Sequence, residues 1–185
     1  LSLKLQDLFT TLNFVLIAFL SLLFHDLGHA LMGRRLGGSD PNIELRLFGG
    51  VTQFTGKRLR SADRIKTIAA GPIVGFLIAG MAGLVILISG LLSGLPTAVS
   101  HVVEVIFWVN IVWSTLNLLP IIPLDGGMML ADLLGPGSET LVRIVSYATI
   151  GFLFLLALFR LDWFAICILV LLGVNQWRQV EPSPA

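Results

Sequence analysis

The sequence predicts a polytopic α-helical membrane protein with about five transmembrane helices and a small membrane-associated β-hairpin. Of its 185 residues, 56% are hydrophobic and only 12% are charged, and the mean hydropathy is +0.92. Soluble domains carry about 25% charged residues, so half that share indicates lipid as the surrounding medium. The apolar residues gather in long runs, and the basic residues gather between two of these runs.

Five apolar segments are expected, because a helix needs about 20 apolar residues to cross a bilayer. They cover residues 11–33, 68–92, 102–119, 142–159 and 163–177. The fifth is short for a full crossing. The chain shows no internal repeat that would pair these segments into equivalent halves.

The basic residues set the expected orientation. Ten of the twelve lysines and arginines fall on one side of five crossings, eight of them between the first two segments. Basic loops stay in the cytoplasm, so we expect the N-terminus outside, the C-terminus in the cytoplasm, and insertion in the cell membrane.

The loop between the first two segments contains a strand-like pattern. In "NIELRLFGGVTQF", residues 42–54, Ile43, Leu45 and Leu47 alternate with charged residues. Alternation with period two is typical of a strand, and Gly49-Gly50 suits a tight turn. A β-hairpin is therefore expected, with chance alternation in a polar loop as the alternative.

Two histidines and an acid occupy the first apolar segment. His25 and His29 are four residues apart, so a helix places them on one face, where they can share a metal ion. Tetrahedral zinc takes two imidazoles, one further protein ligand and a water. His25 lies about 12 Å before the segment ends, and ionisable groups at that depth indicate function. A hydrogen-bonded histidine pair without a metal is the alternative.

The best candidate for a third ligand is Asp125, in "NLLPIIPLDGG", residues 117–127. Pro120 and Pro123 interrupt a helix, and irregular backbone is tolerated at membrane depth only where protein or water covers it. Gly126 and Gly127 permit a close approach of the backbone. The alternative is an exposed aspartate in a loop that leaves the membrane.

Two stripes at helical spacing accompany these motifs. A polar stripe leads to the helix break and indicates a wet or reactive interior: Asn110, Ser114 and Asn117. A stripe of small residues in the second segment predicts close helix packing: Gly71, Gly75, Ala79 and Gly83.

Together, "HDLGH" (25–29) and "NLLPIIPLDGG" resemble the site-2 protease family of intramembrane zinc metalloproteases, with "LFGGV" (47–51) and "AAGP" (69–72) in the expected order. The resemblance covers about residues 12–135. It implies one Zn²⁺ per chain with His25, His29 and Asp125 as ligands. It also implies that Asp26 holds the general-base position and that Asn117 helps to hold the substrate or the oxyanion.

The resemblance further implies a transmembrane protein or peptide as substrate, within the lipid bilayer. The hairpin resembles the family's β element, which is thought to receive substrate as an added strand. No nucleic-acid partner is expected, since the basic loop lacks interleaved aromatic residues. We expect one domain over residues 1–185, with a catalytic core at about 12–135 and additional helices at about 142–177.

The sequence departs from the family pattern at Asp26, where the common pattern has glutamate. Aspartate carries its carboxylate one methylene closer to the backbone, and misplacement by about 1 Å can cost about a hundredfold in rate. At most ten residues precede the first segment, where many relatives have another helix, and no inserted PDZ-type domain is expected.

The predicted function is hydrolysis of a peptide bond in or near a transmembrane segment, as in regulated intramembrane proteolysis. One alternative is a zinc-bound pseudoprotease, weak or inactive, that binds transmembrane segments. Another is a transporter or channel, which broken helices and buried acids also build, although transporters usually show repeated halves.

Overall fold

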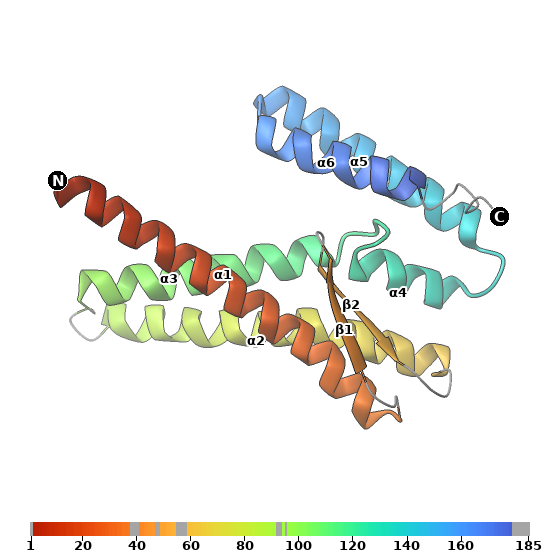
Figure 1. Cartoon of the computed structure of the whole chain (residues 1–185), viewed down its shortest axis with the longest axis horizontal. Helices are drawn as coiled ribbons and strands as arrows, with labels where there is room; N and C mark the ends of the chain where they lie inside the picture. Colours follow the sequence, from red (N-terminus) through yellow and green to blue (C-terminus); the bar gives the residue numbers. More distant parts are fainter. Residues whose placement is uncertain are drawn as a thin grey trace. The chain divides into compact units, whose positions relative to one another are not determined.

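The computed structural model describes residues 2–37, 41–46, 49–54, 59–91, 94 and 96–178 (Figure 1). In chain order the elements are α1 (Ser2–Arg35), β1 (Pro41–Arg46), β2 (Gly49–Phe54), α2 (Ser61–Leu91), α3 (Thr97–Asn117), α4 (Asp125–Leu134), α5 (Glu139–Arg160) and α6 (Trp163–Arg178). The chain divides into two compact units, Leu1–Asn117 and Leu118–Ala185, and each is described by itself.

Four of the described helices are long and apolar enough to cross a membrane: Leu8–Arg35, Ser61–Leu91, Thr97–Asn117 and Glu139–Arg160. Their outward side chains are apolar, as at Phe9 and Leu77, which suits a lipid environment. The polytopic helical class is confirmed. The expected fifth crossing stays a prediction; it falls on α6 (Trp163–Arg178), a helix of 16 residues, which is short against the roughly 20 that a crossing needs.

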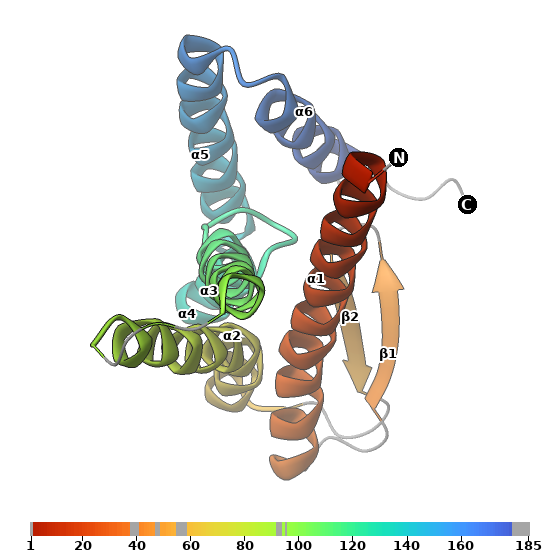
Figure 2. The same cartoon turned by 90° about the vertical axis from the view of Figure 1, so that its left-hand side faces the viewer.

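In the first unit, α1, α2 and α3 pack against one another and α1 also contacts both strands (Figures 1 and 2). Small residues allow this close approach. A Cβ at Gly28 of α1 would lie only 2.8 Å from the carbonyl oxygen of Ala70 in α2. Across the bundle, Asn110 Nδ2 of α3 donates a 3.0 Å hydrogen bond to Ser21 Oγ of α1. Glycine contacts and interhelical hydrogen bonds of this kind hold helices together in lipid, where apolar burial gives no driving force.

Strands β1 and β2 pair in antiparallel fashion, with Pro41 opposite Phe54 and Arg46 opposite Gly49. The prediction that Gly49-Gly50 forms the turn is wrong, because both glycines pair within β2, opposite Arg46 and Leu45. The pairing register, rather than glycine content, decides where the strands end. Residues 47–48, between the strands, lie outside the described residues.

The second unit contains α4, α5 and α6, with α6 packed against α5 (Figure 1). Helix α4 is absent from the sequence prediction, which expects irregular backbone at Pro120 and Pro123 and assigns no helix between residues 119 and 142. It starts immediately after the prolines because Pro123 precedes its first turn, where no intrahelical N–H is lost.

Candidate metal centre

Helix α1 presents His25, Asp26 and His29 in the interior of the first unit. Their exposed fractions are 4%, 3% and 7%. Each offers one ligand atom, and these atoms lie within 4.8 Å of one another. The spacing of one helical turn therefore brings together the two histidines that the sequence predicts, as expected.

The two imidazoles are placed as a shared metal requires. His25 Nε2 and His29 Nε2 lie 3.2 Å apart. Two nitrogens bound to tetrahedral zinc at 2.0–2.1 Å are separated by about 3.3 Å, so the observed separation fits two ligands of one ion. The rings meet edge to face, at 82° with 4.8 Å between their centroids.

A backbone carbonyl of α2 orients His29. The ring nitrogen Nδ1 of His29 donates a 2.9 Å hydrogen bond to the carbonyl oxygen of Thr67. This bond places the proton on Nδ1 and leaves the Nε2 lone pair for a metal. Histidine ligands commonly use their second nitrogen in this way, so the residues present fit a zinc ion.

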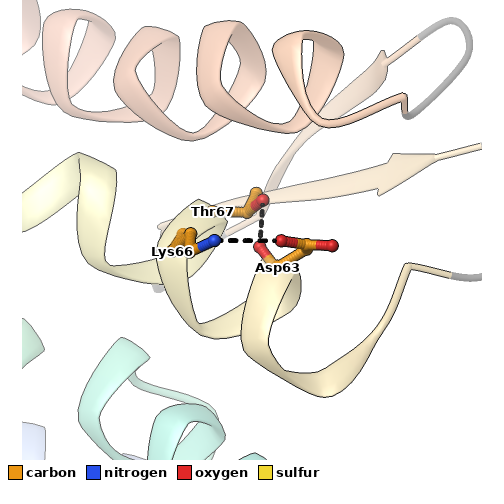
Figure 3. A network of polar contacts seen from close by, with 3 residues as sticks. All are labelled: Asp63, Lys66 and Thr67. Carbon is orange, nitrogen blue, oxygen red and sulfur yellow. Dashed lines mark hydrogen bonds and ion pairs between the residues drawn. The ribbon is translucent and has the colours of Figure 1, made fainter.

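Thr67 is itself fixed within the first turns of α2 (Figure 3). Its Oγ1 donates a 2.8 Å hydrogen bond to the carbonyl oxygen of Asp63, and the Asp63 carboxylate pairs with Lys66 Nζ at 3.2 Å. The sequence analysis missed Thr67. No sequence signal could have found it, because the group that contacts His29 is a peptide carbonyl and carries no side-chain identity.

Gly71 of α2 faces the imidazole pair directly. A Cβ built at this position would collide with His29 Nε2 and would lie 2.8 Å from His25 Nε2. A methyl group there would compete with a metal ion for the same space. The stripe of small residues was interpreted as a packing face, and at Gly71 it also leaves the space in front of the two nitrogens open.

Helix α3 contributes Trp113 and Asn117 to the same unit. The Trp113 ring packs edge to face against His25, with 6.5 Å between centroids. Asn117 is buried at the last position of α3, and its Nδ2 donates a 3.0 Å hydrogen bond to the carbonyl oxygen of Trp113. One amide proton of Asn117 is thus used within its own helix, and its role toward substrate stays a prediction.

Asp125 belongs to the second unit, where it is the first residue of α4 and is buried. A carboxylate at this position is favoured by the partial positive charge of a helix N-terminus. The preceding loop lies tightly against the helix. A Cβ at Gly127 would meet the carbonyl oxygen of Ile121 at 2.6 Å, so only glycine fits there. Asp125 stays the predicted third ligand.

Comparisons with known proteins agree with the sequence motifs. The family model "Peptidase family M50" matches residues 93–158. A putative zinc metalloprotease of Mycobacterium tuberculosis, Rip3, is 36% identical over 112 residues, which are 59% of this chain and 28% of that protein. A zinc metalloprotease of Methanocaldococcus jannaschii is 28% identical over 134 residues, 72% of this chain and 38% of that protein.

Among solved structures, the site-2 protease from Methanocaldococcus jannaschii matches with a TM-score of 0.67 and 20% identity, covering 92% of this chain and 78% of that one. These matches support the site-2 protease family. The chain nevertheless spans less than two fifths of the length of the two metalloproteases it matches in sequence. The site-2 protease fold and the four apolar helices make it an integral membrane protein.

Proposed function

We propose that this chain is an intramembrane zinc metalloprotease that hydrolyses a peptide bond in or near a transmembrane segment of a membrane protein. The observation that carries the proposal is the buried histidine pair. Its two Nε2 atoms converge at 3.2 Å, and a cross-helix carbonyl fixes the tautomer of His29. The names of the matched relatives support the same chemistry.

The proposed zinc ligands are His25, His29 and Asp125, for one ion per chain. Two neutral imidazoles and one carboxylate form a donor set typical of catalytic zinc, which leaves a fourth position open. Zinc bound in such a site lowers the pKa of water and polarises a carbonyl. Gly71 has no side chain to fill the space beside the two Nε2 atoms, which leaves room there for the ion.

Asp26 acts as general base in this proposal. Its carboxylate takes the proton from the attacking water and then passes it to the nitrogen of the leaving amine. It is adjacent to His25 in sequence and almost fully buried, so the proton stays within the site. The shorter reach of aspartate is the reason to expect a slower enzyme than a glutamate variant.

The peptide groups of a transmembrane substrate are engaged in helical hydrogen bonds, so the substrate helix must unwind before a peptide bond can be cleaved. We propose that the hairpin of β1 and β2, associated with the membrane, accepts the unwound segment as an added strand. In this proposal the side-chain amide of Asn117 holds the substrate or the oxyanion, through its Oδ1 and through the Nδ2 hydrogen that Trp113 does not use.

The proposed domain is 1–185, with its core at about 12–135 and its added helices at about 142–177. In the proposed topology the N-terminus lies outside and the crossing by α1 puts the loop before α2 in the cytoplasm; α2, α3, α5 and α6 then make the further crossings that return the C-terminus to the cytoplasm. The basic residues in that loop and in the first turn of α2, Arg60 and Arg64 among them, support this orientation and insertion in the cell membrane.

The decisive experiment is cleavage of a model transmembrane substrate by the purified chain in detergent, with zinc content measured in the same sample. Cleavage that stops with a zinc chelator and returns with added zinc supports the proposal. Stoichiometric zinc with no product at any pH favours the pseudoprotease that binds transmembrane segments. This alternative is tested because Asp26 stands where the common family pattern has glutamate.

A further inference from the structure

The end of α1 and the start of α2 lie at the same end of the first unit (Figure 1). The two helices pack in an antiparallel sense and are level at the hydrogen bond between His29 Nδ1 and the carbonyl oxygen of Thr67. Arg35 comes six residues after His29, and Ser61 comes six residues before Thr67, so each lies about 9 Å beyond that bond along its helix. The last turn of α1 and the first turn of α2 therefore contribute to one surface.

Arginines dominate this surface. Residues 33–37 and 59–67 contain four arginines, one lysine and a single acid. The acid, Asp63, already pairs with the lysine, Lys66, at 3.2 Å. All four arginines are exposed, and we call them the arginine cluster: Arg34, Arg35, Arg60 and Arg64. These two helix ends thus carry a positive charge that their one carboxylate does not balance.

Exposed apolar faces lead up to this surface on both helices. Leu27, Leu31 and Arg35 follow one another at intervals of four residues on one face of α1, and the two leucines are 40% and 52% exposed. On α2, Ile73 is 53% exposed and lies seven residues after Lys66, on the same face. In an integral membrane protein such faces contact acyl chains, and cations at their ends reach the headgroups. The arginine cluster therefore lies at the depth of lipid phosphates.

The side-chain type also favours a phosphate. A guanidinium presents a planar fork that binds two phosphate oxygens through parallel hydrogen bonds, which an ammonium group cannot do. A zwitterionic lipid carries an ammonium group that cancels the charge of its phosphate, whereas an acidic phospholipid keeps a net negative charge. Basic residues at a membrane surface attract acidic lipids, by about fivefold in affinity for each residue.

We propose that the arginine cluster binds the phosphate headgroup of an acidic phospholipid whose acyl chains lie against the exposed apolar faces of α1 and α2. A lipid bound there contacts both helices, and it stabilises the packing that brings the Thr67 carbonyl to His29. The site rests on the insertion of these helices in a membrane. It depends neither on peptide cleavage nor on which end of the chain faces the cytoplasm.

The test is a lipid competition on the full chain in detergent, measured by native mass spectrometry. Phosphatidylglycerol and phosphatidylcholine with identical acyl chains are added at equal concentrations, so that only the headgroups differ. We expect the first bound lipid to be phosphatidylglycerol about ten times as often as phosphatidylcholine at low salt. High salt should bring this ratio close to one, because it screens exposed charges. Inorganic phosphate at the same concentration should not displace the lipid, because it lacks acyl chains.

Two double variants assign the preference to the arginine cluster. Arg34→Gln with Arg35→Gln, and Arg60→Gln with Arg64→Gln, should each lower the preference for phosphatidylglycerol about threefold or more. Arg160→Gln is the matched control, because Arg160 is an exposed arginine at the end of α5, in the other unit, and should leave the preference unchanged. Unfolding temperatures verify the folding of all variants, and the salt dependence of the parent chain tests the charge requirement without them.

Three results would each overturn the proposal. Equal binding of the two lipids by the parent chain would show that the headgroup charge is not recognised. Displacement of phosphatidylglycerol by inorganic phosphate would show a site for a small anion rather than a lipid. An unchanged preference in either double variant, or an equal loss in Arg160→Gln, would show that the arginine cluster does not carry the binding.

Discussion

The histidine pair of α1 and the aspartate that starts α4 are positioned by two different kinds of structure. His25 and His29 stand on a regular helix, and one cross-helix hydrogen bond to Thr67 fixes the ring of His29. Asp125 follows an irregular loop that the next helix holds in place. Ser146 Oγ of α5 donates to the carbonyl oxygen of Pro120 and accepts from the N–H of Ile122.

The difference shows where each half of the proposed site is vulnerable. The helical half depends on free space in front of the two rings, because helix geometry already sets their spacing. The loop half depends on single hydrogen bonds and on glycines, because prolines have removed the regular backbone bonding. Four substitutions test this contrast, ordered from the largest expected effect to the smallest.

Gly71→Ala adds a methyl group to the space between His25 Nε2 and His29 Nε2. We expect zinc content to fall from one ion per chain to near zero, as measured by atomic absorption on purified protein. His29→Ala should lose zinc equally without adding a side chain. Gly80→Ala is the matched control, because a Cβ at Gly80 meets nothing within 4 Å. Stoichiometric zinc in Gly71→Ala would contradict the metal position.

Asp26→Asn removes the proposed base while keeping the size of the side chain. The rate of substrate cleavage should fall by about 100-fold or more, since a positioned acid–base group contributes about that factor. Zinc content should stay unchanged. Asp26→Glu should match or exceed the parent rate. An Asn variant as active as the parent would rule out the base assignment.

Ser146→Ala removes both hydrogen bonds from α5 to the loop before Asp125. The free energy of unfolding should fall by about 1–3 kcal/mol, because a buried N–H and a carbonyl lose their partner. Zinc affinity should fall with it if Asp125 is the third ligand. Thr149→Ala is the control, since Thr149 Oγ1 bonds only the carbonyl of Val145 in its own helix. Equal losses of stability and zinc affinity in the two variants would contradict the idea that Ser146 holds the loop before Asp125 in place.

Lys66→Gln breaks the ion pair with Asp63 at the start of α2. Lys66 is 60% exposed on its side chain, and exposed pairs contribute little. Denaturant unfolding should show a loss of less than about 0.5 kcal/mol, with zinc content unchanged. A larger loss, accompanied by loss of zinc, would show that the first turn of α2 positions Thr67 through this pair.

The sequence predicted the regular helices of this molecule better than its irregular segments. The spans and the histidine pair depend on helical periodicity, which hydropathy and residue spacing reveal directly. Helix α4 and the turn between the strands were not predicted correctly. Pro120, Pro123 and Gly49-Gly50 indicate a break in regular structure, but they do not say where the next element begins or which register pairs the strands.

The groups around the histidines were harder to predict for another reason. The Thr67 carbonyl and the space in front of Gly71 are properties of backbone placement after α1 and α2 have packed. Every residue has a peptide carbonyl, so residue type does not show which carbonyl will contact a histidine, and no residue type marks the space beside a glycine. Only the arrangement of two helices in three dimensions makes them part of a site.

The bond between His29 and the Thr67 carbonyl has a consequence for how this sequence can vary. Substituting Thr67 leaves the carbonyl in place, so many side chains should be tolerated there. Proline is the exception, because it would disturb the helical backbone that positions this carbonyl. Position 67 is therefore constrained through its backbone more than through its side chain, and a library of substitutions at this position should keep zinc content for most small residues and lose it for proline.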